Sequence, residues 1–193
     1  EFLASSEKAS VKLTDFGIAK ILDAKGVTST GQVLGSPAHM APEQIDGGRV
    51  DERTDVFSLG VLIYEALTGR LPFDGANPAQ VLRRVLDGDF VPAEQVRPTV
   101  GSRWSRIVAK AIAKDVEQRY ASAFEFGKAL RAELKASQID DPEREIFLYM
   151  SGPDAYLATF IPRLIDCLIA RATVARDSRQ IHLAAADLNR AIA

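Results

Sequence analysis

The chain is poor in the residues that build disulfide frameworks and histidine-rich sites. It has one cysteine, Cys167, and two histidines, His39 and His182, among 193 residues. A single cysteine excludes an internal disulfide and suits a reducing compartment. The formal net charge of −2 gives no basic excess, so nothing in the composition favours binding to nucleic acid or to an anionic membrane.

Long apolar runs are absent too. No stretch approaches the ~20 apolar residues that a membrane-spanning helix needs. The first ten residues, EFLASSEKAS, lack the basic and apolar regions of a signal peptide. The 47% hydrophobic and 26% charged residues are typical of a globular domain with a real core. We therefore expect a soluble, cytoplasmic protein with no membrane segment, formed by one large domain or by a domain with a helical appendage.

Four short motifs then follow one another along the chain. The first is Asp15-Phe16-Gly17 after Val11-Lys12-Leu13, whose alternation predicts a short strand. Taken alone, this triplet is most simply a turn after a strand. The other three are Ala41-Pro42-Glu43, the segment RTDVFSLGVLIYEALTGRLPF from Arg53, and AKAIAKDVEQRY at 109–120.

In this order, the four motifs resemble the large lobe of a Hanks-type serine/threonine protein kinase of the bacterial style. The resemblance covers about residues 1–135. It implies a mainly α fold, namely the helical large lobe of the protein-kinase fold with a short β element before Asp15. We place this lobe at residues 1–136 and a helical extension at residues 137–193.

The resemblance also implies roles for residues of the first two motifs and of the loop between them. Asp15 would hold Mg²⁺ against the phosphates of ATP, with Phe16 and Gly17 as structural neighbours. Thr28 and Thr30 lie where bacterial kinases of this type carry activating phosphates, although an ordinary solvated loop is the plainer alternative. Ser36 occupies a position that touches the catalytic loop and positions the substrate in serine/threonine kinases. The absence of a tryptophan before Met40 argues against tyrosine kinases, and His39 is interpreted as a packing residue.

Three further residues have structural roles in the resembling family. Its Ala-Pro-Glu glutamate makes a buried ion pair with an arginine before the last helix, which predicts a pair between Glu43 and Arg119. Arginine suits this role because its planar fork can donate two parallel hydrogen bonds to a carboxylate. Asp55 matches a buried aspartate that holds the catalytic loop in shape; a plain helix N-cap is the alternative. We expect its helix to run from about Asp55 to Thr68 and, being apolar nearly all round, to lie inside the core.

The catalytic loop of the family, His-Arg-Asp-x-x-x-x-Asn, does not occur in the sequence, and both histidines follow Asp15. The Gly-rich loop and the ATP-pairing lysine are also missing, so no catalytic residue is expected within this chain. We predict that the parent protein transfers phosphate from Mg-ATP to serine or threonine of protein substrates, whereas this chain alone is inactive and binds neither cofactor. The partners implied are the missing small lobe, protein substrates and a trans-phosphorylating kinase. The alternative function is a non-catalytic, kinase-like scaffold that binds a partner.

Several segments carry ordinary helix signals. Asn77-Pro78 predicts an N-cap and first turn for a helix ending near Leu86. In the extension, Asp141-Pro142 can start a helix through Tyr149, which Ser151-Gly152-Pro153 ends. A longer amphipathic helix follows, with Pro162 as a kink or restart. A last helix contains LAAADLNRAIA, which is faintly similar to tetratricopeptide helices. A helical extension docked on the lobe is the simpler interpretation.

Overall fold

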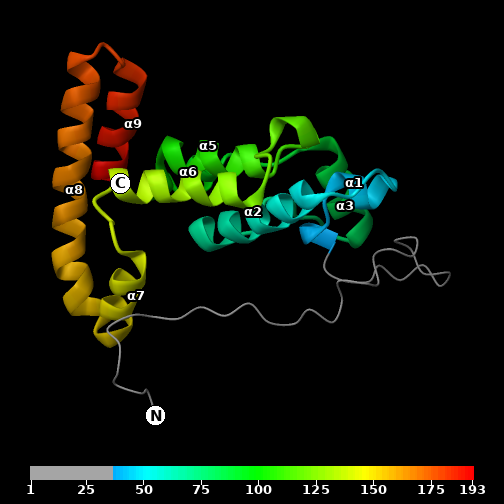
Figure 1. Ribbon diagram of the computed structural model, residues 1–193, viewed down its shortest axis with the longest axis horizontal. Helices are drawn as coiled ribbons and strands as arrows, with labels where there is room; N and C mark the ends of the chain where they lie inside the picture. Colours follow the sequence, from blue (N-terminus) through cyan, green and yellow to red (C-terminus); the bar gives the residue numbers. More distant parts are fainter. Residues whose placement is uncertain (1–36) are drawn as a thin grey trace. The chain divides into compact units, whose positions relative to one another are not determined.

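Helices and their connecting loops make up all of residues 37–193, which are the residues described by the computed structural model (Figure 1). The prediction of a mainly α fold is confirmed for this part of the chain. The short strand expected before Asp15 lies outside the described residues. The chain divides into two units, one ending at Leu130 and the other comprising Arg131–Ala193. Among residues 37–193 no helix is long and apolar enough to cross a membrane.

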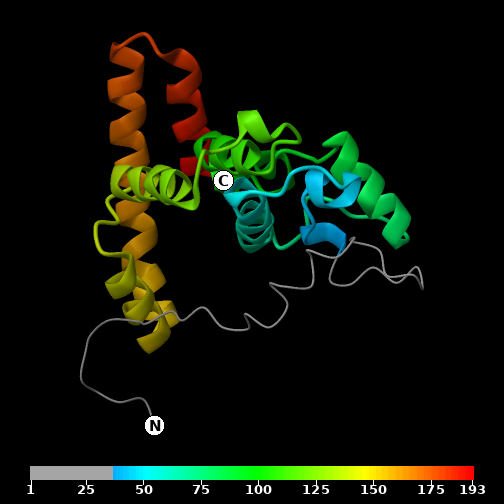
Figure 2. The same cartoon turned by 45° about the vertical axis from the view of Figure 1, so that its right-hand side comes forward.

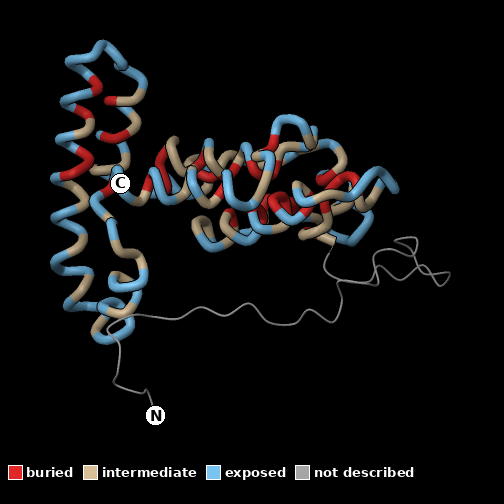
Figure 3. Tube along the Cα trace, in the orientation of Figure 1, coloured by how far each residue is buried: buried red, intermediate tan, exposed pale blue. Residues whose placement is uncertain are grey.

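The first unit is built around α2. Its aromatic core stacks Phe57 on Phe73, with ring centroids 5.8 Å apart. Tyr64 and Val108 are buried in the same cluster, and buried residues run through the interior of this unit in Figure 3. The elements of the unit are η3 (Pro37–His39), α1 (Pro42–Asp46), α2 (Glu52–Thr68), α3 (Pro78–Asp87), α4 (Ala93–Val96), η4 (Pro98–Val100), α5 (Gly101–Ala111), η5 (Val116–Gln118) and α6 (Ala123–Ala136), which continues into the second unit.

Helix α2 begins earlier than the sequence suggested. Asp51, not Asp55, is its N-cap, and the Asp51 carboxylate accepts a hydrogen bond of 2.9 Å from the Arg53 amide. Such a cap satisfies an amide that would otherwise have no partner in the first turn. The expected start at Asp55 was therefore wrong by one turn, whereas the expected end at Thr68 is confirmed. Helix α3 begins as predicted, because the Asn77 side chain accepts a hydrogen bond from the Gln80 amide.

A glycine in the middle of α2 allows close approach of α5. A Cβ atom added to Gly60 would lie 2.8 Å from Ala111 Cβ and 2.8 Å from Ile112 Cγ2. Any larger side chain at position 60 would have to push the two helices apart. Ala111 is also buried in a cluster with Val56 and with Phe126 of α6.

The second unit contains a helical hairpin. Its helices are α7 (Pro142–Ser151), α8 (Pro153–Asp177) and α9 (Ile181–Ile192). Helix α8 continues through Pro162, which excludes a restart there, one of the two alternatives expected at this residue. Figures 1 and 2 show α8 and α9 side by side. Small residues form their buried contact, namely Ala172, Ala175 and Ala184.

Charged side chains are buried in the second unit as well. The Arg171 guanidinium lies 3.0 Å from Glu133 Oε1 and 3.4 Å from Asp187 Oδ1. Glu133 is 7% exposed and Asp187 is 2% exposed. Two carboxylates can be buried at this point because one arginine offers several donors to both. These contacts connect the end of α6 with α8 and α9, and the sequence analysis did not foresee them.

Candidate functional site

Glu43 and Arg119, the two residues expected to pair, lie in direct contact. Arg119 Nη1 donates to Glu43 Oε1 and Arg119 Nη2 to Glu43 Oε2, both at 2.8 Å. The Arg119 side chain is fully buried and that of Glu43 is 8% exposed. Glu43 belongs to α1 and Arg119 directly follows η5, so the ion pair joins segments 76 residues apart. This two-bond geometry is the strong form of a charge-assisted contact.

Arg119 has further partners that sequence analysis missed. Its Nε donates to Ala113 O at 2.8 Å, while Nη1 and Nη2 reach Arg53 O and Lys114 O, each at 3.2 Å. With the two Glu43 bonds, all five N–H donors of the guanidinium have an acceptor. The guanidinium carbon also lies 4.8 Å from the centre of the Phe57 ring, within the range of a cation–π contact. One side chain thus joins α1, α2 and the loop after α5.

Glu43 has a second donor. The Thr54 hydroxyl of α2 donates to Glu43 Oε1 at 2.7 Å. Burial by itself raises the pKa of a carboxyl group, but the hydrogen bonds from Arg119 and Thr54 outweigh it and hold the pKa of Glu43 below its ordinary value of 4.5. Glu43 is therefore an ionised, buried carboxylate. No sequence signal marked Thr54, although it adjoins Asp55 in the motif that suggested the kinase lobe.

A half-exposed ion-pair network lies beside the Glu43–Arg119 pair. Arg53 Nη1 lies 2.9 Å from Glu117 Oε1, and Arg53 Nη2 lies 2.8 Å from Asp51 Oδ2. The hydrogen bonds from Arg53 lower the pKa of Asp51 to about 2. Glu117 belongs to η5, so this network also connects the start of α2 with the segment that carries Arg119.

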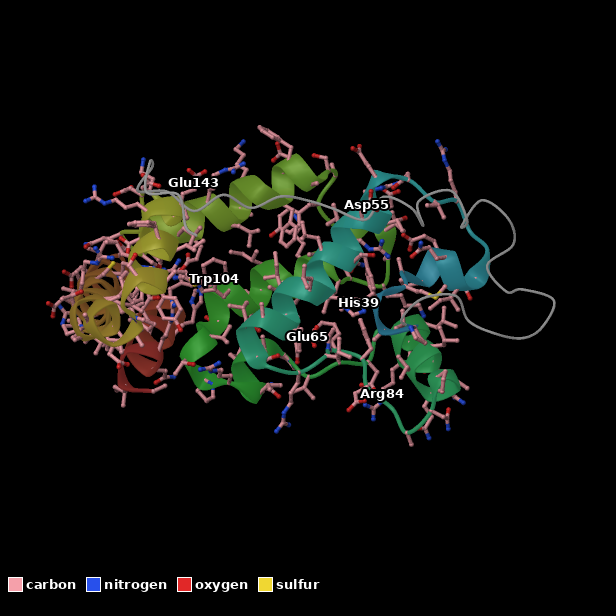
Figure 4. The ribbon with its side chains drawn as sticks, turned by 90° about the horizontal axis from the view of Figure 1, so that it is seen from below. His39, Asp55, Glu65, Arg84, Trp104 and Glu143 are labelled. Atoms are coloured by element: carbon pink, nitrogen blue, oxygen red, sulfur yellow. The ribbon has the colours of Figure 1, made fainter. Side chains whose placement is uncertain are left out.

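Asp55 and His39 both lie within the described residues. The side chain of Asp55 is exposed, so its expected burial was wrong for the described part of the chain. Asp55 lies in the first turn of α2, where the Asp51 side chain already caps the helix. His39 Nε2 lies 4.0 Å from Glu65 Oε2 across the edge of α2, and Figure 4 shows both side chains.

The remaining predicted site residues lie outside the described residues. These are Asp15, Phe16, Gly17, Thr28, Thr30 and Ser36. Within residues 37–193 no group of three or more His, Cys, Asp or Glu side chains could hold a metal ion. The described part of the site is therefore a structural one, formed by the Glu43–Arg119 pair and its neighbours.

These contacts connect the Ala-Pro-Glu segment to the helical base, as expected of a kinase large lobe. A comparison with protein-family models matches residues 2–130 to the protein kinase domain. The chain belongs to the protein kinase family. Its last 63 residues, 131–193, lie beyond this match.

Individual relatives are bacterial kinases. The serine/threonine-protein kinase PknL of Mycobacterium tuberculosis is 40% identical over 132 residues, which is 68% of this chain and 33% of PknL. For the serine/threonine-protein kinase PrkC of Bacillus subtilis, the identity is 32% over 163 residues, 84% of this chain and 24% of PrkC. The tyrosine-protein kinase MasK of Myxococcus xanthus is 42% identical over 127 residues, 66% of this chain and 20% of MasK. The chain thus spans a third or less of the length of these relatives.

Proposed function

We propose that this chain is the large-lobe part of a serine/threonine protein kinase whose intact form transfers phosphate from Mg-ATP to protein substrates. The Glu43–Arg119 ion pair is the observation that carries the proposal. It fixes the end of the segment that holds Thr28, Thr30 and Ser36 to the helical base. In a kinase this segment binds the protein substrate, so a rigid attachment serves substrate positioning.

Serine or threonine is the proposed acceptor, rather than tyrosine. PknL and PrkC are named as serine/threonine kinases, whereas MasK is named as a tyrosine kinase. The residue before Met40 is His39, not the tryptophan typical of tyrosine kinases. Identification of the phosphorylated amino acid in products of the intact parent kinase would decide the acceptor class.

Asp15 is the residue proposed to hold Mg²⁺, which would neutralise charge on the phosphates of bound ATP. Phe16 and Gly17 are proposed to set its position. Phosphoryl transfer needs several parts in place together, including a catalytic aspartate from His-Arg-Asp and a phosphate-binding loop. The 193 residues contain neither. We therefore propose that this chain alone does not transfer phosphate, and that Thr28 and Thr30 are acceptors for an intact kinase acting in trans.

One experiment with two arms tests these proposals. In the first arm, the purified chain is incubated with labelled ATP and Mg²⁺ or Mn²⁺, and no label should be transferred to the chain or to a generic acceptor. Transfer that disappears in Asp15→Ala would refute the proposed inactivity. In the second arm, an intact relative such as PknL is added and the phosphorylated residues are mapped by mass spectrometry.

In the second arm, label is expected at Thr28 and Thr30 and should fall sharply in the Thr28→Ala/Thr30→Ala double variant. A matched control is Thr159→Ala/Thr173→Ala, which removes two exposed threonines of α8. Label that is undiminished in the Thr28/Thr30 variant, or confined to other residues, would contradict the assignment of these acceptors.

A second candidate function is a non-catalytic, kinase-like scaffold. The observation in its favour is that the sequence contains no catalytic loop, while residues 37–130 still form an ordered core. The sequence of the parent protein would distinguish the two functions. A His-Arg-Asp motif and its asparagine upstream of Glu1 in the parent would favour the enzyme, and a parent without them would favour the scaffold.

A further inference from the structure

A cavity among the described residues lies at the base of α1. Its volume is about 760 Å³, within the range of ligand sites in proteins. It is formed by α1, the end of α5 and η5, with Phe90 from the loop after α3. The apolar lining residues are Pro42, Phe90, Ala109, Ala113 and Val116. We call this cavity the α1 pocket.

Charged side chains of one predominant sign surround the apolar lining. Asp46, Asp115 and Glu117 line the α1 pocket and are exposed, whereas Lys114 is the one exposed lining residue with a positive charge. Because the apolar lining is buried or half-buried and these side chains are exposed, they stand at the rim.

Two of the rim carboxylates are available to a ligand. Glu117 is already paired with Arg53 at 2.9 Å. Asp115 Oδ1 accepts a hydrogen bond from the Glu117 amide, which leaves Oδ2 without a partner in the part of the chain that the structure describes. Among those same residues, Asp46 has no cation within 4.0 Å. An apolar floor with two such carboxylates at its rim is complementary to an apolar group flanked by positive charges.

We propose that the α1 pocket is a docking site for a polypeptide segment in which an apolar or aromatic side chain is flanked by arginine or lysine. The apolar side chain enters between Phe90 and Val116. The flanking cations lie against Asp46 and Asp115. Acidic or neutral segments are disfavoured because they leave these carboxylates without a counter-charge.

The position of the α1 pocket connects it with the Glu43–Arg119 ion pair. Glu43 itself lines the pocket, as do Ala113 and Lys114, whose carbonyl oxygens accept hydrogen bonds from Arg119. A segment bound there contacts the same residues that hold α1 to the helical base. Its binding therefore stabilises this arrangement by mass action. This inference does not depend on the proposed phosphoryl transfer, since it concerns binding to this chain alone.

The test is a titration of the ¹⁵N-labelled full chain with three capped peptides, followed by NMR. Gly-Arg-Phe-Arg-Gly carries both features, Gly-Glu-Phe-Glu-Gly reverses the charges, and Gly-Arg-Ser-Arg-Gly lacks the apolar side chain. Only the first is expected to bind saturably, with a Kd on the order of 100 µM. The shifted amide signals should include those of Ala113 and Val116.

Variants of the chain identify the site. Ala109→Leu fills the α1 pocket and should abolish saturable binding. Asp46→Asn/Asp115→Asn should raise the Kd by about 5- to 10-fold, since asparagine at position 115 can still accept the η5 cap bond. Asp87→Asn, an exposed acidic residue of α3 outside the pocket, is the matched control and should leave the Kd unchanged.

Urea unfolding of each variant, followed by the fluorescence of Trp104, establishes that the fold is retained. If Ala109→Leu is unfolded, the proposal is tested with Asp46→Asn/Asp115→Asn alone. The proposal is overturned if none of the peptides binds, or if the Glu-flanked peptide binds as tightly as the Arg-flanked one. It is also overturned if Asp87→Asn weakens binding as much as the double variant does.

Discussion

Arg119 uses all five of its N–H donors inside the protein, so its role is not limited to the ion pair with Glu43. Two donors bind Glu43, and the other three bind carbonyl oxygens of Arg53, Ala113 and Lys114. A buried guanidinium is costly unless each donor is satisfied. The surrounding loop conformation therefore depends on Arg119 as much as Arg119 depends on the loop.

Removal of Arg119 should destabilise the chain strongly. Arg119→Ala leaves the Glu43 carboxylate buried with only Thr54 as a side-chain donor, and we expect a loss of about 3–5 kcal/mol. Glu43→Ala leaves the buried Arg119 guanidinium without its counter-charge and should also lower the free energy of unfolding. The loss in the double variant should be much smaller than the sum of the two single losses. Urea unfolding monitored through Trp104 gives the three values.

Arg53→Ala, which breaks the half-exposed network, is the control and should have a small effect. Additive losses below about 1 kcal/mol would show that the ion pair does not stabilise the fold.

The low pKa of Glu43 predicts how the contribution of the pair depends on pH. A carboxyl group whose pKa is lower in the folded state stabilises the fold above its unfolded pKa, here the ordinary 4.5. This stabilisation is lost as the pH falls through the folded pKa. Glu43→Gln keeps the shape of the side chain but cannot ionise. The difference in unfolding free energy between wild type and Glu43→Gln should therefore be full at about pH 7 and should shrink as the pH is lowered below 4.5 and through the folded pKa. A difference that stays constant over this range would contradict an ionised Glu43.

Helices α2 and α5 show which contacts between elements follow from sequence and which do not. The apolar pattern predicted α2 as a core helix, and Asn77-Pro78 predicted the start of α3, because these signals are local. The start of α2 was placed one turn too late, since two aspartates, Asp51 and Asp55, lie one turn apart and only the backbone conformation distinguishes them. The apolar pattern also suggested burial on every side, yet Leu62 is 54% exposed because no described residue covers that face. Arg119 could be paired with Glu43 only through the family resemblance, as no local rule connects residues 76 positions apart.

The close contact of α2 and α5 at Gly60 gives a prediction for this pair of helices. Gly60→Ala should improve the helix propensity of α2 by about 1 kcal/mol. It should nevertheless destabilise the chain by roughly 1–3 kcal/mol in total, because the new Cβ atom overlaps Ala111 and Ile112. In Gly60→Ala/Ala111→Gly one of the two overlaps is relieved, so the loss should be smaller than the sum of the single losses. Thermal or urea unfolding of the four proteins measures this coupling. Ala66→Gly, exposed on the same helix, serves as the propensity control. An increase in stability for Gly60→Ala would mean that the helices are free to move apart.

At the scale of the whole molecule, α6 is shared between two units. The match to the protein kinase domain ends at residue 130, and the division between the units falls at the same place. The sequence pattern instead suggested a boundary after residue 136, at the end of the helix. The residues between the two positions include Glu133, whose carboxylate binds Arg171 of α8. Charge pairs of this kind leave no periodic signal in a sequence, so the packing of the extension was beyond prediction. Small residues rather than large apolar ones make the buried contact between α8 and α9, since Ala172, Ala175 and Ala184 are buried while Ile181 and Ile192 are exposed.

Truncation at either end of α6 tests where the kinase lobe stops. We propose residues 1–136 as the lobe and residues 137–193 as the extension. A chain ending after Ala136 keeps Phe126 and Leu130, which pack against Val56 and Ala111 within the first unit. It should therefore unfold cooperatively, as reported by the fluorescence of Trp104. A chain ending after Tyr120 loses the whole of α6. Loss of the buried Phe126 side chain alone should lower the free energy of unfolding by about 3–5 kcal/mol. This is a large share of the roughly 5–15 kcal/mol by which a typical domain is stable. The shorter chain should accordingly melt at much lower urea or fail to fold. If the chain ending after Ala136 is unfolded as well, the extension is required for the lobe, and the proposed boundary is wrong.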